Sequence, residues 1–285
     1  MTTLDEMMAH IRNCFMVAGV EDPMAEARII VGGLLGLERS DFITKGDDHL
    51  DLADEIRIHD AVGRRTGGEP PYRILGTRPF YGLEFRLSKE TLEPRPDTEI
   101  LVDTVLELLG DRRDEALRIL DLGTGTGAIC LSLLSELPNA LGTGTDLSSD
   151  ALERASENAV LNGLAERFST VESRWFDNLS GTYDVIVSNP PYIRSSVIPG
   201  LDPEVREHDP VLALDGGEDG LEAYRAIAAG ARPHLAGPKG IIAVETGYDQ
   251  RADVEKIFAD NGFSLLKAVK DYGGNDRVQV FSVKI

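Results

Sequence analysis

The chain has 285 residues, and its 29 Lys and Arg against 49 Asp and Glu give a formal net charge of −20. A hydrophobic fraction of 42% predicts a folded protein and excludes an intrinsically disordered one. The acidity argues against a general nucleic-acid binder, which normally needs a basic face, and favours a small-molecule substrate or a basic macromolecular partner.

Cysteine content and the N-terminal sequence indicate the compartment. Cys14 and Cys130 are the only cysteines, too few for a disulfide framework or a zinc cluster. The first 15 residues carry acids before their first base and match neither a signal peptide nor a transit peptide. No apolar run approaches the length of a membrane span. We therefore expect a cytoplasmic protein with no membrane partner.

Residues 1–70 are predicted to be helical. Thr3 and Glu6 fit a capping box for a first helix that stops at Gly19. Its apolar face carries Leu4, Met8, Ile11 and Phe15. A second helix is expected from Asp22-Pro23 to about residue 36. A third is expected over 51–65, with Leu52, Ile56 and Val62 on its inner side.

A break over residues 67–71 precedes a different pattern. Residues 80–87 predict a small β-hairpin, and Asp97 is expected to cap a helix that ends near Leu109. Helices and short apolar strands then alternate, which predicts βαβ units and a mainly parallel sheet. The predicted strands are 118–122, 141–145, 167–171, 183–188, 240–246, 264–270 and 277–284, and the helices are 127–137, 149–162, 219–235 and 250–261. The last two strands have no helix between them and should pair antiparallel, as in Rossmann-like methyltransferases.

The first chemical motif is a glycine-rich turn between a strand and a helix. It reads Gly123, Thr124, Gly125, Thr126 and Gly127. Such a turn lets backbone amides approach a ligand closely. The spacing differs from the G-x-G-x-x-G that favours a pyrophosphate, and therefore favours S-adenosylmethionine over a dinucleotide. An ordinary tight turn is the alternative.

Asp146 and Trp175, which follow the second and the third predicted strands, extend this site. Residues 142–145 repeat the glycine pattern but are expected to form the second strand, with Asp146 at its carboxyl end. An acid at this position can bind both ribose hydroxyls of a nucleoside. Trp175 follows the third strand, where its ring would border an adenine base or pack in the core.

The second chemical motif ends the fourth strand and reads Asn189, Pro190, Pro191 and Tyr192. Two prolines cannot continue a strand, so they form a rigid turn at the ligand-binding edge. The Asn189 side-chain oxygen and the Pro190 carbonyl can accept both N–H bonds of a planar amide or amine, while Tyr192 packs against it. This chemistry needs no metal and no covalent nucleophile.

The motifs together resemble those of the HemK/PrmC family, the protein-(glutamine-N5) methyltransferases of peptide chain release factors. The resemblance covers nearly the whole chain. Its motifs are Gly68-Glu69-Pro70, residues 93–99 (EPRPDTE), the two motifs above, residues 215–221 (DGGEDGL) and residues 275–278 (NDRV). Glu93 departs from the pattern, since an aliphatic residue is usual there, and Pro70-Pro71-Tyr72-Arg73 stands near where a Gln is usual.

The resemblance implies a fold, a reaction and roles for the motif residues. It implies a helical domain (1–72) that docks the release factor, a hairpin linker (73–96) and a Rossmann-like class I methyltransferase domain (97–285). The implied reaction transfers a methyl group from S-adenosylmethionine to the GGQ glutamine of class 1 release factors, in translation termination, and releases S-adenosylhomocysteine. The glycine turn, Asp146, Trp175 and Asn189 would carry the cofactor, and residues 189–192 the substrate glutamine. We expect a monomer without direct nucleic-acid contact.

Other side chains and other functions offer alternatives to this reading. Arg95 either contacts the cofactor carboxylate or ties the linker to the domain, and the five histidines show no metal-ligand spacing. The alternatives are a ribosomal-protein glutamine methyltransferase, a nucleic-acid adenine-N6 methyltransferase that flips its base, and a cofactor-binding protein without catalysis. Residues 193–220 carry seven acids against two arginines, which favours a basic protein substrate over a phosphate backbone.

Overall fold

The structure is a computed structural model that describes residues 2–284, and its chain divides into two compact units. Unit 1 holds the chain up to Thr77 together with Asp202–His208. Unit 2 holds Arg78–Leu201 and the chain from Asp209 onward. The three-part domain division at residues 72 and 96 remains a prediction.

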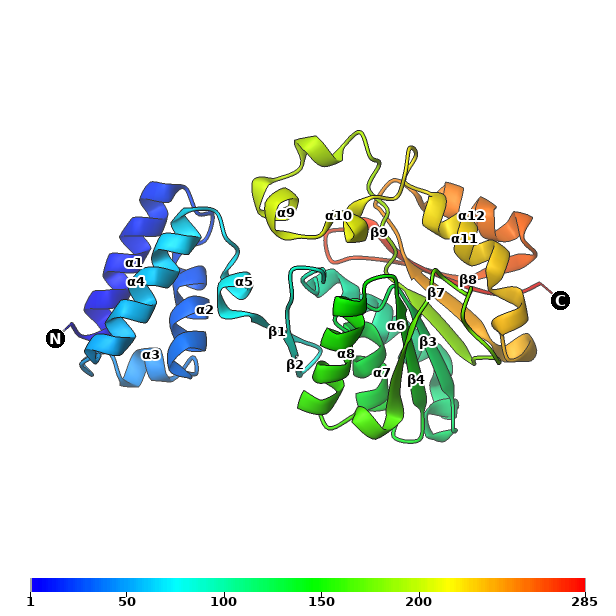
Figure 1. The fold of residues 1–285 in the computed structure, drawn as a ribbon, viewed down its shortest axis with the longest axis horizontal. Helices are drawn as coiled ribbons and strands as arrows, with labels where there is room; N and C mark the ends of the chain where they lie inside the picture. Colours follow the sequence, from blue (N-terminus) through cyan, green and yellow to red (C-terminus); the bar gives the residue numbers. More distant parts are fainter. Residues whose placement is uncertain (1, 285) are drawn as a thin grey trace. The chain divides into compact units, whose positions relative to one another are not determined.

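Unit 1 is helical, as Figure 1 shows. Its elements are α1 (Leu4–Ala18), α2 (Pro23–Leu35), α3 (Asp41–Thr44), α4 (Leu52–Thr66), α5 (Pro71–Leu75) and α9 (Pro203–His208). The predicted signals act as expected: Thr3 and Glu6 form a capping box, Asp22 caps α2, and Gly19 ends α1 in the left-handed conformation. The short helices α3, α5 and α9 were not predicted.

The predicted inner side of α4 is wrong at two positions. Leu52 is 72% exposed and Ile56 is 60% exposed. The buried face instead carries Ile58, Ala61, Val62 and Arg65, which follow the i, i+3, i+4, i+7 spacing of one helix face. Leu52 and Ile56 lie outside that stripe. Arg65 is buried because its guanidinium pairs with Glu26 of α2 and, at 2.6 Å, with Glu204 of α9.

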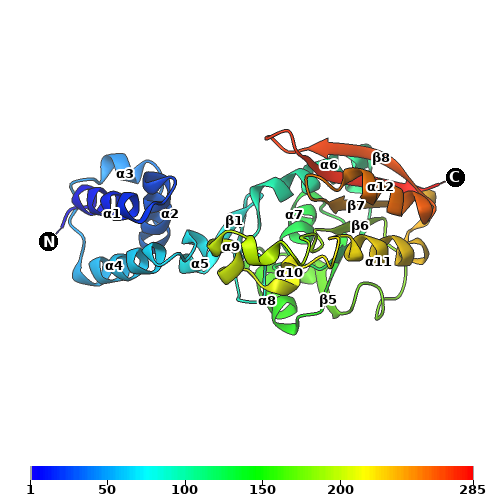
Figure 2. The ribbon, with the colours of Figure 1, turned by 90° about the horizontal axis from the view of Figure 1, so that it is seen from above.

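Unit 2 contains the predicted α/β fold, entered through a hairpin of β1 (Thr77–Phe80) and β2 (Leu83–Arg86). The seven-stranded sheet has the order β5-β4-β3-β6-β7-β9-β8. Its strands are β3 (Arg118–Leu122), β4 (Leu141–Asp146), β5 (Phe168–Glu172), β6 (Val185–Ser188), β7 (Ile241–Glu245), β8 (Phe263–Lys270) and β9 (Asp276–Val283). Strands β3 to β7 pair in parallel, and β9 pairs antiparallel with both β7 and β8. Figure 2 shows the β8–β9 hairpin at one edge of this sheet, as the sequence predicts.

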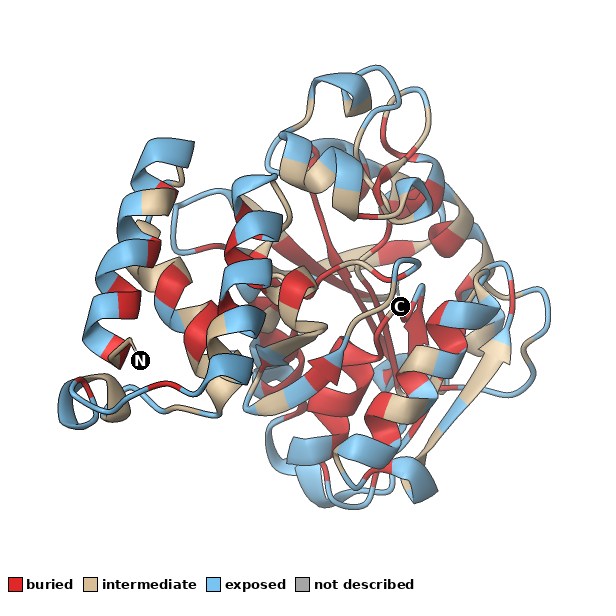
Figure 3. Ribbon diagram, turned by 60° about the vertical axis from the view of Figure 1, so that its left-hand side comes forward, coloured by how far each residue is buried: buried red, intermediate tan, exposed pale blue. Residues whose placement is uncertain are grey.

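Helices cover both faces of the sheet. Successive residues of a strand face opposite sides, so each face has its own hydrophobic core. Ile119 belongs to the core under α6 (Glu99–Leu109), α7 (Ala128–Glu136) and α8 (Ser149–Leu161). The next residue, Leu120, belongs to the core under α11 (Glu222–Gly230) and α12 (Arg251–Asp260). Figure 3 shows buried residues concentrated in the strands and on the inward sides of these helices. Buried on both faces, β6 and β7 are apolar except at their last residues.

Two helix predictions in unit 2 need correction. Asp97 does not cap α6: it lies in a 3₁₀ turn over Pro96–Thr98, and its carboxylate lies 3.3 Å from Arg277. The predicted helix 219–235 is shorter, because α11 ends at Gly230 and a 3₁₀ turn around Pro233 follows. The loop after β6 also contains the unpredicted α10 (Val211–Leu214). Among residues 2–284, no helix combines the length and the apolar character that crossing a membrane requires.

Candidate active site

A cavity of about 380 Å³ lies at the carboxyl ends of the parallel strands of unit 2. This is within the range of small-molecule sites and at the edge where such folds bind ligands. The cavity brings together eight of the predicted site residues: Gly123, Thr124, Gly125, Thr126, Asp146, Trp175, Asn189 and Pro191. Gly127, Pro190 and Tyr192 lie beside the lining rather than in it.

The glycine-rich turn connects β3 to α7 with backbone angles that favour glycine. Gly123, Gly125 and Gly127 have φ values of 71°, 53° and 82°. The turn is tied to the neighbouring strand, because the Thr124 amide donates to the Thr145 carbonyl at 2.8 Å. Gly127 starts α7 and packs against α8, where an added Cβ would lie 3.3 Å from the Ala155 Cβ. The turn is therefore an anchored wall of the cavity.

The second glycine pair belongs to β4, as predicted, and its glycines serve packing. A Cβ on Gly142 would lie 2.5 Å from the Cys130 sulfur, and one on Gly144 would lie 2.8 Å from the Thr124 hydroxyl. Helix α7 and the glycine turn thus lie directly on β4. The free thiol of Cys130 is buried in that contact.

Asp146 and Trp175 occupy the cavity wall next to the glycine turn. The Asp146 carboxylate accepts the Gly125 amide at 3.0 Å and the Ser148 amide at 3.0 Å. Its remaining lone pairs are available to hydroxyl groups. Trp175 follows β5 with φ 52°, an uncommon left-handed conformation for a bulky residue. The Ser173 hydroxyl holds that bend by donating to the Trp175 carbonyl at 3.1 Å.

The Asn-Pro-Pro-Tyr turn leaves β6 at the same edge. Ser188 is fully buried and donates its hydroxyl to the Leu122 carbonyl at 2.7 Å, so it is not placed as a nucleophile. Asn189 is half-buried and faces the cavity, and Pro190 is buried behind it. The Tyr192 phenol donates to Glu245 at 3.3 Å, and burial raises the pKa of this phenol.

The glycine-rich residues 215–221 explain how this turn is supported. A Cβ on Gly216 would lie 2.8 Å from the Pro191 carbonyl oxygen, and one on Gly220 would lie 2.5 Å from the Tyr192 carbonyl oxygen. Gln250 bridges both segments by donating to the carbonyls of Tyr192 at 2.9 Å and of Gly220 at 3.0 Å. Only glycine lets the two backbones approach this closely.

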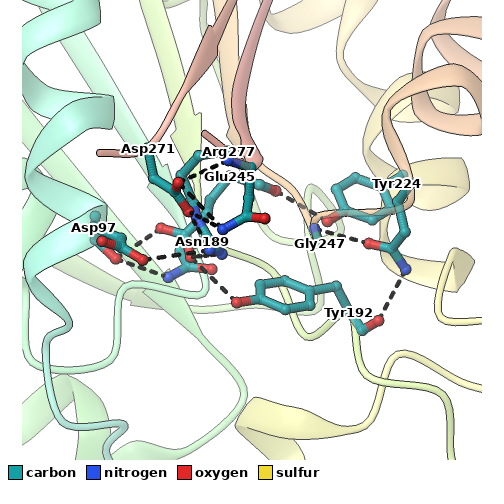
Figure 4. A network of polar contacts seen from close by, with 11 residues as sticks. Asp97, Asn189, Tyr192, Tyr224, Glu245, Gly247, Asp271 and Arg277 are labelled. Atoms are coloured by element: carbon teal, nitrogen blue, oxygen red, sulfur yellow. Dashed lines mark hydrogen bonds and ion pairs between the residues drawn. The ribbon is translucent and has the colours of Figure 1, made fainter. Parts of the chain in front are cut away.

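The structure brings three further polar residues toward Asn189, two of them from the motifs at 93–99 and 275–278, whose residues had no predicted role. Thr98, which lines the cavity, forms a network with Glu245 and Arg277. Figure 4 labels Glu245 and Arg277 together with Asp97 and Asp271, which pair with Arg277. The sequence does contain a sign that Glu245 is functional: it is a carboxylate at the end of the otherwise apolar strand Ile241–Glu245.

Arg95 and Glu93, in the segment before α6, both form ion pairs. Arg95 lines the cavity and pairs with Asp209 at 2.6 Å, so this segment is tied to the loop after β6. Glu93, an unusual residue at its position in the motif, is buried and pairs with Arg78 at 2.8 Å. Within residues 2–284, no three His, Cys, Asp or Glu side chains are grouped as metal ligands.

Asp121, at the end of β3, gives the site a pH-dependent stability. The residue is fully buried, and desolvation raises its pKa to about 7, although the Thr124 hydroxyl donates to it at 2.8 Å. Between about pH 4 and pH 7 the folded chain therefore holds a proton that the unfolded chain has lost. This stabilisation is present below about pH 4 and is lost as the pH rises to about 7.

Asp121→Asn should flatten this dependence. We expect the free energy of unfolding of the wild type to fall relative to the variant by up to about 1.4 kcal/mol per pH unit in that window. Denaturant unfolding of both proteins at pH 5, 6, 7 and 8 measures the difference, in which all other titrating groups cancel. Parallel curves would show that Asp121 is ionised throughout.

Comparisons with known proteins show what the chain is similar to. The family described as Methyltransferase small domain matches residues 96–198, and the PrmC N-terminal domain matches residues 6–76. The chain is 54% identical over 281 residues to the release factor glutamine methyltransferase of Agrobacterium fabrum, covering 98% of this chain and 97% of that protein. It is 41% identical to the protein of that name from Caulobacter vibrioides, covering 94% and 91%. A methyltransferase structure from Pyrococcus furiosus, 19% identical, covers 82% of this chain and 100% of its own with a TM-score of 0.52, which indicates a shared fold.

Proposed function

Because this chain belongs to the family of release factor glutamine methyltransferases, we propose that it methylates the side-chain amide nitrogen (N5) of a glutamine in a release factor. The target is the glutamine of the GGQ motif in class 1 release factors. One observation carries the proposal: the glycine turn with Asp146 and the turn at Asn189 and Pro191 line the same cavity. We infer that a nucleoside site and an amide-binding site share this cavity.

The residues of the cavity fit S-adenosylmethionine, which supplies a methyl group on a positively charged sulfonium. Asp146 retains lone pairs for the two ribose hydroxyls, and Trp175 stands on the wall after β5, beside the adenine position of the fold. The glycine turn offers backbone without side chains, and Gly144 beneath it leaves no room for a Cβ. A volume of about 380 Å³ is sufficient for a nucleoside-sized ligand.

The residues of this chain act by positioning the substrate amide, and none of them forms a covalent bond with it. An amide nitrogen is a poor nucleophile because its lone pair is delocalised into the carbonyl. The Asn189 oxygen and the Pro190 carbonyl accept its two N–H bonds, which holds the nitrogen in one orientation and stabilises the positive charge that develops on it. The two prolines keep these acceptors rigid.

The direct test supplies radiolabelled S-adenosylmethionine and compares purified release factor, ribosomal proteins, RNA and DNA as acceptors. Label on the GGQ glutamine of the release factor, located by peptide mass spectrometry, is the expected result. Label only in a ribosomal protein would favour the sister activity, and label in nucleic acid would favour an adenine-N6 methyltransferase. Binding of the cofactor without any transfer would leave a binding protein only.

The acidic loop 193–220 contributes to partner choice in this proposal, though less than its composition suggests. Four of its seven acids are neutralised by arginines of the chain: Glu204, Glu207, Asp209 and Asp219. Glu218 remains exposed and makes no ion pair within residues 2–284. We propose that such exposed acids attract a basic release factor, that the helical unit 1 docks it, and that the enzyme acts as a cytoplasmic monomer.

Glu218→Lys should weaken the encounter with the release factor. We expect KM for this substrate to rise about threefold at low salt with kcat unchanged, because a charge at the rim of a site acts mainly on association. The difference should shrink above about 0.3 M salt, where screening shortens electrostatic reach. Glu166→Lys makes the same charge change on an exposed residue before β5, at the opposite edge of the sheet, and serves as the control. Equal KM values for the two variants would remove the loop from substrate choice.

A further inference from the structure

The Asn189 side chain has two chemically different ends, and the proposed function needs one particular end in the cavity. Its oxygen can accept an N–H of a substrate amide, whereas its NH₂ group would meet that N–H donor to donor. The orientation of a side-chain amide is set by its hydrogen bonds. The partner of the inner end of Asn189 therefore matters.

That partner is the Thr98 hydroxyl, which lies 3.3 Å from the Asn189 amide nitrogen. Thr98 is only 4% exposed and stands at the start of α6. A hydroxyl has one proton, and the Thr98 proton is donated to the Glu245 carboxylate, whose Oε2 lies 2.7 Å away. The Thr98 oxygen is thereby left as an acceptor, and only the NH₂ end of Asn189 can satisfy it.

The Glu245 carboxylate starts this chain of directed hydrogen bonds. It is 2% exposed at the end of β7, and its other oxygen accepts the Tyr192 phenol at 3.3 Å. Burial raises its pKa, and Arg277 opposes this, since its guanidinium lies 3.9 Å from the same oxygen. The Thr98 hydroxyl donates to Oε2 at 2.7 Å and the Tyr192 phenol donates to Oε1 at 3.3 Å, so both of these hydrogen bonds run toward Glu245.

Arg277 is itself held by the residues drawn around it in Figure 4. Its Nη2 lies 2.9 Å from Asp271 and 3.3 Å from Asp97, and the side chain is 14% exposed. These pairs come from the β8–β9 hairpin and from the segment before α6. The antiparallel end of the sheet thus supplies the cation that faces the buried carboxylate.

We propose that Thr98 and Glu245 are positioning residues that lock the side-chain amide of Asn189 with its oxygen toward the substrate. The proposal rests on the proposed function, because it specifies how the acceptor for the substrate amide is oriented. Without the Thr98 hydroxyl, Asn189 can present either end. With a neutral amide at position 245, the direction of the whole chain of hydrogen bonds can reverse, since that amide can donate to Thr98 and Thr98 can then donate to the Asn189 oxygen.

Thr98→Val tests the hydroxyl with almost no change of shape. We expect kcat for the release factor to fall about 10- to 100-fold, as for other losses of orientation in an active site. The affinity for S-adenosylmethionine, measured by calorimetry, and the midpoint of thermal unfolding should change little. Thr98→Ser retains the hydroxyl and should restore kcat to within about threefold of the wild type. A role in packing alone would instead favour Val over Ser.

Glu245→Gln tests the direction of the hydrogen bonds. We expect a loss of kcat at least as large as that of Thr98→Val. The double variant should be no worse than Glu245→Gln alone, because both residues act through one amide. Additive losses, or a Thr98→Val enzyme with full kcat, would overturn the proposal. Failure of the wild type to methylate any glutamine would instead refute the proposed function, so the two outcomes are distinguishable.

Discussion

Replacement of Asn189 by alanine is expected to lower methyl transfer to the release factor by about 10³-fold or more. The substitution removes the side-chain acceptor for one substrate N–H and frees the amide to rotate, so both the orientation and the stabilisation of developing charge are lost. The measurement is kcat with saturating release factor and cofactor. Because Asn189 also lines the cavity, a moderate loss of cofactor affinity should accompany this effect.

The fold should survive this change. Asn189 is half-buried at the end of β6, and the turn keeps its two prolines and the Gln250 bridge to the Tyr192 carbonyl. Unfolding midpoints within a few degrees of the wild type are therefore expected. Ser196→Ala, an exposed position in the same loop, is a control that should retain transfer. Full activity of Asn189→Ala would refute the amide-acceptor mechanism.

Replacement of Asp146 by alanine is expected to weaken cofactor binding by about 100-fold or more. Hydrogen bonds from neutral hydroxyls to an ionised acceptor contribute about 1.5 to 3 kcal/mol each, and two ribose hydroxyls would lose their partner. The same carboxylate also accepts the amides of Gly125 and Ser148, so its removal loosens the glycine turn from the end of β4. Calorimetric titration with S-adenosylhomocysteine measures the effect without catalysis.

A control variant at a neighbouring acid distinguishes ribose binding by Asp146 from a general effect of removing a negative charge. Glu153→Ala removes an exposed carboxylate from α8, the helix that follows Asp146, and should leave the Kd within about twofold of the wild type. Equal losses in both variants would indicate a long-range electrostatic effect. An unchanged Kd in Asp146→Ala would exclude the ribose role and leave Asp146 as an anchor of the turn.

Local patterns predicted the fold wherever neighbouring residues decide the conformation. The capping box at Thr3, the start of α2 at Asp22 and the antiparallel pair at the C-terminus are short-range features, and each is confirmed. The inner face of α4 was wrong because apolar side chains occur on both sides of that helix, and only packing against α1 and α2 selects one. The same limit applies to Asp97, whose partner, Arg277, is 180 residues away in the chain.

In the candidate site, too, some features depend on neighbouring residues in the sequence and others only on the tertiary structure. The glycine turn and the Asn-Pro-Pro-Tyr turn are each contiguous, so the amino-acid sequence alone carries the hypothesis of a nucleoside site and an amide-binding turn. The structure adds that residues of both turns line one cavity. The orientation of the Asn189 amide depends on Thr98, Glu245 and Arg277, which come from three separate segments. Hydrogen-bond direction is a property of neighbours in space, and only the packed sheet brings those neighbours together.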